Sequence, residues 1–579
     1  MLKQSLVRFA LLTFLSLYFG CISALQVTRD EDGVQLLGDR DAQGFGGFPD
    51  LYEASIADLQ KGLQKRQFTS VDLVKAYLAR IDEVNLKGPT LRAVLEINPN
   101  ALKQAKALDL ERKRKGARGP LHGIPILVKD NIGTQHSEGM NTTAGSFALL
   151  GSVVPRDATV IAKLRAAGAI ILGKSNLSEW ANFRGMVPSG FSGRGGQSTS
   201  PYVPLGDPSG SSSGSGIATA IGLVAAALGS ETDGSIVSPS QNNNLVGIKP
   251  TVGLTSRAGV IPISGHQDTV GPMARSVTDA ATVLTAIAGR DPLDKATFSQ
   301  PRNVPDFTKA LKKNALKGVR LGVPRGLVAF STFDVIKAFN ASLVQMKKLG
   351  ATIVDPADLP DLNELLTSTS EQTVLLADFK VELNDYISKL GKVPTGVKNL
   401  EDIIAFNIAN ADKELVPPFW TDQTIFLVSQ NTTRDKAYFD AVAESKELGR
   451  TKGIDAALKL FKLDALVLPT DFAATPAAIA GYPLVTGQHH TFSLLPFVSS
   501  LVVVPLGFLP PETPLSAAEP TRPAGPNMPF GLSFMGTAFS EFKLISFAYA
   551  YEQATLTRLK KRAFSAAVPK TQLKDVVRR

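Results

Sequence analysis

The sequence predicts an α/β fold built around one large domain, and two observations support this. Helix-like and strand-like segments alternate between residues 100 and 280, which is typical of a sheet covered by helices. The 579 residues are 44% hydrophobic and 20% charged, as in ordinary soluble globular proteins, so the chain can bury a large core. We find no internal repeat and no heptad pattern, and therefore expect a single domain rather than a repeat array.

The expected elements begin with a helix at Val71–Val84. Thr69 can cap this helix, because Asp72 follows three residues later and the apolar residues have helical spacing. A second helix is expected at Asn100–Lys115, and Gly123–Val128 (GIPILV) is typical of a short buried strand. The remaining expected elements are a helix at Asp157–Ala167, a strand at Ala169–Leu172, an alanine-rich helix at Ile217–Ala227 that ends in a loop at Leu228-Gly229, a largely helical region at Phe307–Phe461, strands at Ala465–Thr470 and Pro529–Phe534, and a last helix at Glu541–Arg562.

The segment from residue 1 to residue 24 is typical of a secretory signal peptide. Lys3 and Arg8 give a positive start, and Phe9–Phe19 form an apolar core. Small residues for cleavage follow at Ile22–Ala24. The alternative is an uncleaved membrane anchor, but a spanning helix needs about 20 apolar residues. We therefore expect cleavage, a secreted extracellular protein, and a flexible N-terminal lead-in over residues 25–49.

The composition excludes several kinds of chemistry. Cys21 is the only cysteine and lies in the leader, so the mature chain has neither a thiol nucleophile nor a thiolate metal site. The five histidines accompany no H-E-x-x-H motif, and no metal site is expected. The net charge of +10 is spread thinly, without a nucleic-acid-binding module. Triplets compatible with glycosylation occur at Asn141, Asn176, Asn340 and Asn431.

Two clusters of glycine and serine stand out. Taken alone, Asp207–Gly216 (DPSGSSSGSG) would be interpreted as a flexible linker. It runs directly into the alanine-rich helix, however, and a helix N-terminus favours negative charge. A second cluster, Gly229–Ser240 (GSETDGSIVSPS), follows closely; taken alone, it would be a turn. A helix with a tight return between the clusters would bring them together.

These clusters resemble the amidase signature family, which pairs a G-G-S-S-G-G loop with a downstream G-T-D-x-G-G-S loop. Leu121–Ile132 (LHGIPILVKDNI) resembles the family's lysine-bearing strand. The resemblance implies that Lys129 is the base, Ser211 the cis-serine and Ser235 the nucleophile. The spacing between Ser211 and Ser235 is the one that the family usually shows, which favours Ser211 over the two serines that follow it.

The resemblance extends over most of the chain and carries further expectations. It implies a single amidase domain at residues 50–565, with a basic C-terminal tail at 566–579. It also implies the amidase signature fold, in which a central mixed, twisted β-sheet is covered by helices on both sides. No cofactor is implied. The oxyanion hole would be formed by the backbone amides of Thr232, Asp233, Gly234 and Ser235.

The family mechanism requires a neutral lysine. A serine hydroxyl is a poor nucleophile until a base removes its proton, and in this family the lysine does so through the bridging cis-serine. A free lysine has a pKa of about 10.4. We expect burial beside the apolar residues Ile126–Val128 to lower the pKa of Lys129, because burial disfavours the charged form.

The chain departs from the family pattern in two places. Glu231–Val237 (ETDGSIV) lacks an arginine that is common in the family, and it resembles the branch of bacterial peptide amidases, which remove C-terminal amides from peptides. The second departure is Gly487–Val503, a largely apolar insertion that carries His489 and His490. It is either a retained intron in the gene model, which we favour, or a real loop or lid near the substrate entrance.

The sequence thus predicts a secreted serine amidase that hydrolyses carboxamide C–N bonds through an acyl-enzyme on Ser235. The expected substrate is a small-molecule or peptide amide, and the site could also hydrolyse esters. The alternatives are a catalytically dead secreted scaffold and a glutamine amidotransferase-like subunit. We expect a monomer or homodimer with no nucleic-acid partner and no stable membrane association. Candidate specificity residues are Trp180, Phe183, Phe191 and Tyr202, with the helical region 360–430.

Overall fold

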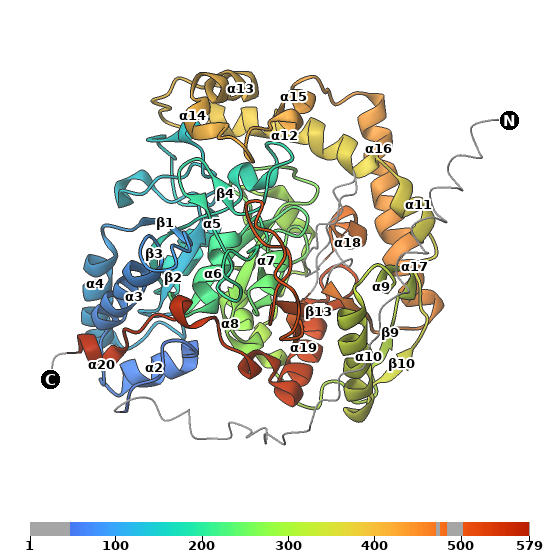
Figure 1. Ribbon diagram of the computed structural model, residues 1–579, viewed down its shortest axis with the longest axis horizontal. Coiled ribbons are helices and arrows are strands. Elements are labelled where there is room, and N and C mark those ends of the chain that lie inside the picture. Colours follow the sequence, from blue (N-terminus) through green and yellow to red (C-terminus); the bar gives the residue numbers. More distant parts are fainter. Residues whose placement is uncertain (1–46, 471–474, 483–501, 578–579) are drawn as a thin grey trace, which may run out of the picture. The chain divides into compact units, whose positions relative to one another are not determined.

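The computed structural model describes residues 47–470, 475–482 and 502–577, all of which belong to one unit of the fold. Two β-sheets run through this unit, and helices surround them (Figure 1). The expected signal peptide and nearly all of the lead-in lie outside the described residues, as does the expected insertion up to residue 501. Within the described residues, no helix has the length and hydropathy needed to cross a membrane.

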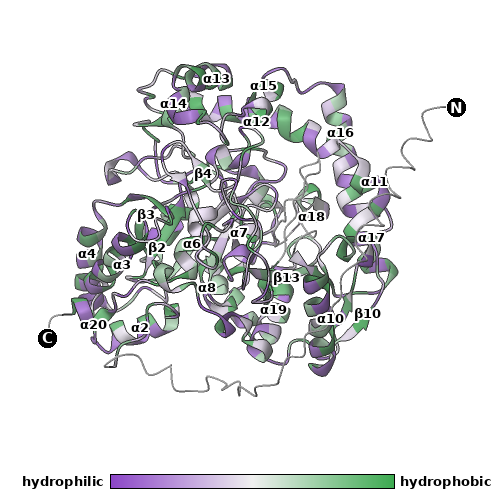
Figure 2. Cartoon of the chain, in the orientation of Figure 1, coloured by the Kyte–Doolittle hydropathy of each residue, from purple (hydrophilic) through white to green (hydrophobic). Residues whose placement is uncertain are grey.

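The first sheet has six strands in the order β1-β3-β2-β6-β8-β7. Strands β3, β2 and β6 are parallel, whereas β1, β8 and β7 run antiparallel to their neighbours, so the sheet is mixed. The central strands β2 and β3 are strongly hydrophobic (Figure 2). The strands are β1 (Val94–Ile97), β2 (Pro125–Lys129), β3 (Ile170–Ser175), β6 (Ala226–Glu231), β7 (Val246–Gly247) and β8 (Thr269–Ala274).

The second sheet has five strands in the order β10-β9-β11-β13-β12. A β-bridge between Ile248, directly after β7, and Val502 of β12 brings the two sheets side by side. A separate two-stranded ribbon is formed by β4 (Phe191–Ser192) and β5 (Gly196–Gln197). The strands of the second sheet are β9 (Arg320–Gly322), β10 (Thr352–Val354), β11 (Ala465–Pro469), β12 (Val502–Phe508) and β13 (Pro529–Met535).

Helices pack on these sheets and form an additional group around residues 360–460, which contains α11 to α17 (Figure 1). In the expected basic tail, Leu573 is buried and α20 contacts α3. The helices near the first sheet and at the C-terminus are α2 (Ile56–Gln64), α3 (Ser70–Val84), α4 (Ala101–Lys115), α5 (Thr159–Ala166), α6 (Ser213–Ala220), α7 (Val237–Asn242), α8 (Val277–Ile287), α19 (Glu541–Thr555) and α20 (Leu573–Val576). The other helices are α9 (Arg325–Val328), α10 (Phe333–Lys348), α11 (Leu362–Thr367), α12 (Ser370–Ser388), α13 (Leu400–Ala409), α14 (Ala411–Glu414), α15 (Thr424–Gln430), α16 (Lys436–Lys446), α17 (Asp455–Leu460) and α18 (Thr475–Ala480).

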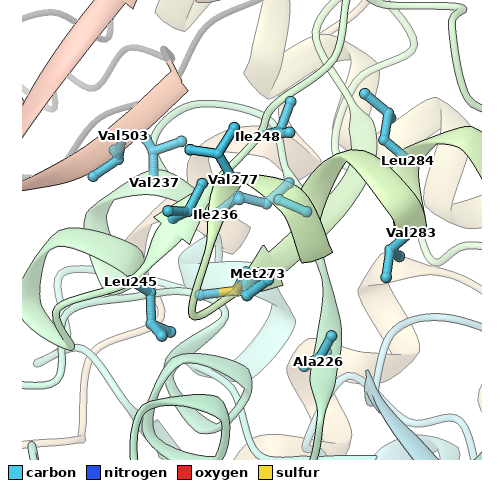
Figure 3. Packing of buried hydrophobic residues seen from close by; sticks show 14 of the residues in the cluster. Ala226, Ile236, Val237, Leu245, Ile248, Met273, Val277, Val283, Leu284 and Val503 are labelled. Carbon is cyan, nitrogen blue, oxygen red and sulfur yellow. The ribbon is translucent and has the colours of Figure 1, made fainter. Parts of the chain in front are cut away.

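One hydrophobic core joins the two sheets behind α7. Ile236 and Val237 are fully buried at the start of this helix, together with Met273 of β8 and Leu284 of α8. Val503 of β12 lies in the same cluster (Figure 3). Each of these side chains contributes about 1.5–3 kcal/mol by leaving water. The loop that precedes α7 is therefore anchored on a well-packed base.

Most of the expected elements are confirmed within a few residues. The helix after Thr69 is α3, and the predicted cap is present: the Thr69 side chain accepts a hydrogen bond from the Asp72 amide, and the Asp72 side chain accepts one from the Thr69 amide. Strands β2, β3, β11 and β13 also occur where the sequence indicated them. Capping residues and short apolar runs between turns were sufficient to identify these elements.

The alanine-rich helix was predicted wrongly. The helix α6 starts earlier, at Ser213, and ends at Ala220, while Ala226–Glu231 form strand β6 instead of a helix end and a loop. Gly222 has φ +66° and lies against the Leu51 carbonyl, so the chain turns there. Every residue of β6 is buried, and a run of alanines buried on both faces has no periodicity that separates strand from helix.

The last helix is shorter than expected. Helix α19 ends at Thr555, because Leu556 adopts a left-handed conformation with φ +46°. A short 3₁₀ turn, Thr557–Lys560, follows. Its Arg558 is buried and forms an ion pair with Glu53.

Candidate active site

The site lies where the parallel strands β2 and β6 end. Lys129 is the last residue of β2, and β6 ends at Glu231 before the loop that carries Ser235. The two strands are paired side by side, with Val128 next to Leu228. Because the carboxyl ends of parallel strands share one edge of a sheet, the lysine and the serine loop meet there, as ligand sites of α/β sheets commonly do.

Lys129 and Ser211 are in direct contact. The Lys129 Nζ donates to the Ser211 Oγ at 2.7 Å and to the Ser230 carbonyl at 3.0 Å. Both residues are buried, with exposed fractions of 0% for Lys129 and 1% for Ser211. Burial lowers the pKa of Lys129 to about 7, although the carboxyl groups of Glu231 and Asp268 partly counteract it. A substantial neutral fraction of this lysine is therefore present near neutral pH.

The backbone around Ser211 is fixed on both sides. The Gly210–Ser211 peptide bond is cis. The Ser211 carbonyl accepts a hydrogen bond from the Ser178 amide at 3.0 Å, and the Ser212 amide donates to the Ser235 carbonyl at 3.0 Å. The structure thus brings the three residues selected from the sequence together, from three separate segments of the chain.

The hydrogen bonds also distinguish Ser211 from the two serines that follow it. The Ser212 hydroxyl donates to the Ser230 carbonyl at 3.2 Å, and the Ser213 hydroxyl donates to the Ser209 carbonyl at 2.5 Å. Within the serine run, Ser211 is therefore the residue whose hydroxyl contacts the ammonium of Lys129.

The loop Thr232–Ser235 is held by two carboxylates. Glu231 Oε2 accepts hydrogen bonds from the amides of Ile236 at 2.7 Å and Val237 at 3.2 Å, directly after Ser235. Asp268 accepts from the Thr232 hydroxyl at 2.6 Å. Gly234 has φ +79°, which favours glycine at this turn. Ser235, with an exposed fraction of 7%, is buried beneath the surface.

The role of Glu231 in this loop was not recognised from the sequence. Its signal is an acidic residue four positions before the candidate nucleophile, but only the folded loop shows which amides it accepts from. Burial raises the pKa of Glu231 and lowers the pKa of Lys249, while the opposite charge of each group partly offsets the shift of the other. The Lys249 ammonium donates to the Tyr482 carbonyl at 2.7 Å.

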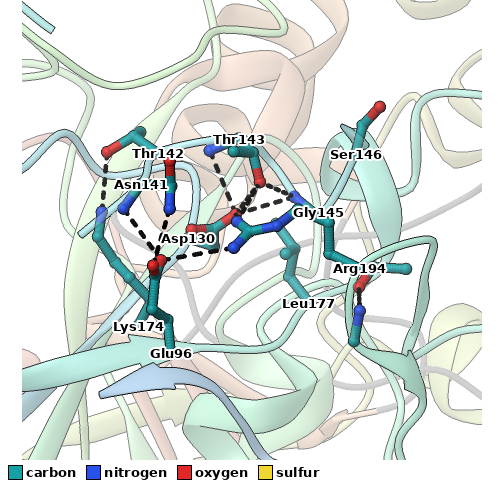
Figure 4. Close-up of polar contacts among 12 residues, drawn as sticks. Glu96, Asp130, Asn141, Thr142, Thr143, Gly145, Ser146, Lys174, Leu177 and Arg194 are labelled. Carbon is teal, nitrogen blue, oxygen red and sulfur yellow. Dashed lines mark hydrogen bonds and ion pairs between the residues drawn. The ribbon is translucent and has the colours of Figure 1, made fainter. Parts of the chain in front are cut away.

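A polar network supports the end of β2 from the other side (Figure 4). Asp130, next to Lys129, accepts hydrogen bonds from the Thr143 hydroxyl at 2.6 Å and the Gly145 amide at 2.9 Å. The buried Lys174 donates to the Thr142 hydroxyl at 2.9 Å. Two adjacent strand ends are thereby tied to the segment Asn141–Ser146, which keeps the backbone at Lys129 in place.

Three of the four candidate specificity aromatics contact aromatic residues of the helical region 360–430. Tyr202 differs, because it packs beside Phe508 and its hydroxyl accepts from Asn244, so it belongs to the core. The other contacts are Phe191 stacked on Trp420 with ring centroids 4.5 Å apart, Phe183 beside Phe379 at 4.9 Å, and Trp180 edge-on to Phe426 at 5.9 Å.

The histidines take no part in this site as far as it is described. His122 is buried, and its ring nitrogens contact the Leu108 carbonyl and the Arg118 amide. His266 Nδ1 contacts Asp378 at 2.8 Å. His489 and His490 lie outside the described residues. Among the described residues, no three His, Cys, Asp or Glu side chains are grouped as a metal site would require.

Comparisons with known proteins identify the family of the chain. A family model described as Amidase matches residues 72–545. A relative from Arthroderma benhamiae that bears an amidase name is 43% identical over 554 residues, covering 91% of this chain and 90% of that one. A glutamyl-tRNA(Gln) amidotransferase subunit from Geobacter metallireducens is 32% identical over 513 residues, covering 87% of this chain and 98% of that one.

A solved structure shows the same fold. The crystal structure of the native peptide amidase from Stenotrophomonas maltophilia matches with a TM-score of 0.76 and 41% identity, covering 90% of this chain and 99% of that one. The fold is therefore the amidase signature fold, and the activity class is hydrolysis of C–N bonds in amides. By its sequence, its fold and its match to the family model, the chain belongs to the amidase family.

Proposed function

We propose that this amidase hydrolyses the terminal carboxamide of peptides, with Ser235 as the nucleophile and Lys129 as the base acting through Ser211. The observation that carries the proposal is the 2.7 Å contact between the Lys129 ammonium and the Ser211 hydroxyl. Burial lowers the pKa of this lysine to about 7, and the best general base has a pKa near the working pH.

In the first half of the reaction, neutral Lys129 takes the proton of the Ser211 hydroxyl while Ser211 takes that of Ser235. The Ser235 oxygen attacks the amide carbon, and the carbonyl oxygen becomes an oxyanion. Backbone amides of Thr232–Ser235 donate to it; one such donor is typically worth about 2.7–4 kcal/mol. The proton then returns from Lys129 through Ser211 to the leaving nitrogen, the C–N bond breaks, and ammonia departs from the acyl-enzyme.

In the second half, a water molecule takes the place of the departed ammonia. Lys129, again through Ser211, takes a proton from the water, whose oxygen attacks the acyl carbon. The bond to Ser235 breaks, the serine recovers its proton, and a carboxylic acid leaves. The same two steps would hydrolyse an ester, because both substrates pass through one acyl-enzyme.

Two observations support a peptide amide as the substrate. The Glu231–Val237 segment carries the E-T-D-G-S pattern, and the chain is 41% identical to the Stenotrophomonas maltophilia peptide amidase over 90% of its length. An amidotransferase role has weaker support, since the identity to the Geobacter metallireducens protein is 32% and the leader is typical of a secreted protein.

The substrate proposal is tested with purified protein and a panel of peptide amides, free glutamine, short aliphatic amides and peptides with a free C-terminus. Ammonia and the new carboxylic acid are both quantified. We expect release from peptide amides at least about tenfold faster than from glutamine, as kcat/KM. Turnover of glutamine alone would contradict the proposal, and the Ser235→Ala variant serves as the blank.

We also propose that the mature protein is secreted after cleavage near Ala24 and is glycosylated. The support is the positively charged, apolar leader and the exposed position of two asparagines of glycosylation triplets, Asn340 and Asn431. Mass spectrometry of culture-medium protein tests this: an N-terminus close to Leu25 is expected, and retention of the leader on the protein would contradict it.

The insertion Gly487–Val503 is proposed to be a retained intron. Its last two residues, Val502 and Val503, pair with Phe534 and Ser533 of β13 and are buried. Excision would bring Val485-Thr486 directly before Val504, and these two residues could fill the same strand positions. Sequencing of the transcript tests the idea, because a dominant message that contains these codons would contradict it.

A further inference from the structure

Two buried glutamates lie outside the Lys129–Ser211–Ser235 set, on segments far apart in the chain. Glu179 begins a short turn, Glu179–Asn182, and Glu414 is the last residue of α14. Both side chains are fully buried, and their carboxyl groups contact each other. Buried carboxyl groups are costly unless they are paired or protonated, so this pair requires an explanation.

The hydrogen bonds of the pair leave one carboxyl oxygen without a donor. Glu179 accepts from the Arg184 guanidinium at 3.1 Å and from the Gly193 amide at 2.8 Å. Glu414 Oε1 accepts from the Ser146 hydroxyl at 3.0 Å and from the Phe147 amide at 2.6 Å. Glu414 Oε2 has no donor among the described residues. A proton between the two carboxyl groups would satisfy it.

The charged groups around Glu179 also indicate that the two carboxyl groups share a proton. Glu414 and Arg184 are the charged groups that act on Glu179, so two carboxylates would share one cation in the absence of a proton. Burial and the repulsion from Glu414 hold the pKa of Glu179 well above its usual range, while Arg184 partly offsets them. Two other charged residues near the pair have partners of their own: Lys413 lies over the Phe147 ring, and Asp422 accepts from the Met186 amide.

Arg184 ties the same segment down at further points. Its guanidinium donates to the backbone carbonyls of Glu414, Trp420 at 2.6 Å and Asp422 at 3.1 Å. Its own carbonyl accepts from the Phe426 amide at 3.1 Å. The segment 414–426 is therefore fastened to the turn that starts at Glu179.

That turn is directly connected to the cis-serine. Ser178, the residue before Glu179, donates its amide to the Ser211 carbonyl at 3.0 Å. The Ser178 hydroxyl accepts from the Gly190 amide at 2.8 Å, and a side chain at Gly210 would collide with it at 2.3 Å. A displacement at Glu179 is therefore passed directly to the peptide that presents Ser211 to Lys129.

We propose that Glu179 and Glu414 are positioning residues that share one proton, and that this protonated pair holds segment 414–426 against the turn that fixes Ser211. The inference rests on the proposed catalytic role of Ser211. A carboxyl group with a raised pKa stabilises its folded arrangement fully below the ordinary carboxyl pKa, and this contribution is lost as the pH rises through the raised value. A rise in pH through this raised value therefore removes the proton, the two carboxylates repel each other, and Ser211 loses its support.

The test is the pH profile of kcat/KM for the wild type and Glu414→Gln. The glutamine keeps an oxygen for Ser146 and gives Glu179 a permanent N–H donor. Above the pH at which the pair loses its proton, wild-type kcat/KM is expected to fall about tenfold per pH unit. In Glu414→Gln this loss moves up by at least about one pH unit, while activity at pH 7 stays within about threefold. Glu401→Gln, on the exposed first turn of α13, is the matched control and keeps the wild-type profile.

The proposal would be overturned if kcat/KM fell at the same high pH in the wild type and in Glu414→Gln. It would also be overturned if wild-type kcat/KM showed no such fall up to pH 10. If Glu414→Gln does not fold, the wild type alone decides. Hydrogen exchange in residues 414–426, corrected for the intrinsic pH effect, is expected to accelerate relative to α4 between pH 7 and 9.5; equal behaviour overturns the proposal. Loss of Ser235-dependent hydrolysis at every pH in the wild type would instead contradict the proposed function.

Discussion

The Lys129 ammonium lies 2.7 Å from the Ser211 hydroxyl, inside a fold where both side chains are excluded from water. The lysine reaches this position from the end of β2, and the serine from the loop before α6. The Ser212 amide in turn donates to the Ser235 carbonyl. We propose that this arrangement activates Ser235 through Ser211 and Lys129.

Replacement of Lys129 by methionine removes the proposed base. We expect kcat/KM to fall by about 10²–10⁴-fold, the usual contribution of a general base. Because burial lowers the pKa of Lys129 to about 7 and the neutral form is the active one, wild-type kcat/KM should rise with pH through about 7. Steady-state kinetics between pH 5 and 9 check both points. The exposed Lys115→Met is the control, and a variant Lys129→Met with wild-type activity would refute the assignment.

Replacement of Glu231 by glutamine separates its two effects on the site. The amide oxygen can still accept from Ile236 and Val237, so the loop should keep its shape. The negative charge that raises the pKa of Lys129 is lost, so that pKa falls and the acidic limb of the kcat/KM profile moves to lower pH. Glu231→Ala should instead reduce kcat at every pH. A shift of the acidic limb to higher pH in Glu231→Gln would contradict the expected effect of the Glu231 charge on the pKa of Lys129.

Gly214 is required for the close approach of α6 to its neighbours. A Cβ there would lie 2.1 Å from the Ala93 carbonyl oxygen and 2.6 Å from the Asn176 amide nitrogen. We expect Gly214→Ala to cost about 1–3 kcal/mol in folding free energy, as overpacking does, and to lower the thermal unfolding midpoint. Gly119→Ala has no heavy atom within 4 Å of the new Cβ and should change stability by less than about 0.5 kcal/mol. Equal midpoints for the two variants would contradict this role of Gly214 in the packing of α6.

Glycosylation should follow exposure. Asn340 and Asn431 are exposed, whereas Asn176 is fully buried and donates to the Arg92 carbonyl. Asn141 is half-buried, with its amide hydrogen-bonded to Glu96. Glycopeptide mapping of secreted protein is expected to show glycan on Asn340 or Asn431 and none on the two others. A glycan on Asn176 in active enzyme would be incompatible with the structure.

The catalytic positions could be proposed from the sequence because they lie in short motifs of fixed spacing. Strand β6 could not, since its alanines are buried on both faces and carry no periodicity. The contacts of Glu231 depend on how one loop turns back on itself. The pairing of Glu179 with Glu414 depends on packing between segments far apart in the chain, and neither residue shows this locally.

The central claim is that Ser235 is the nucleophile. A fluorophosphonate probe followed by peptide mapping tests it most directly, because the probe forms a covalent bond only with an activated serine. Ser238, buried three residues later and without a hydroxyl partner among the described residues, provides the control variant Ser238→Ala. We predict probe on Ser235 in the wild type and in Ser238→Ala, and no labelling of Ser235→Ala. Labelling that persists in Ser235→Ala, or that maps to another serine, would contradict the account.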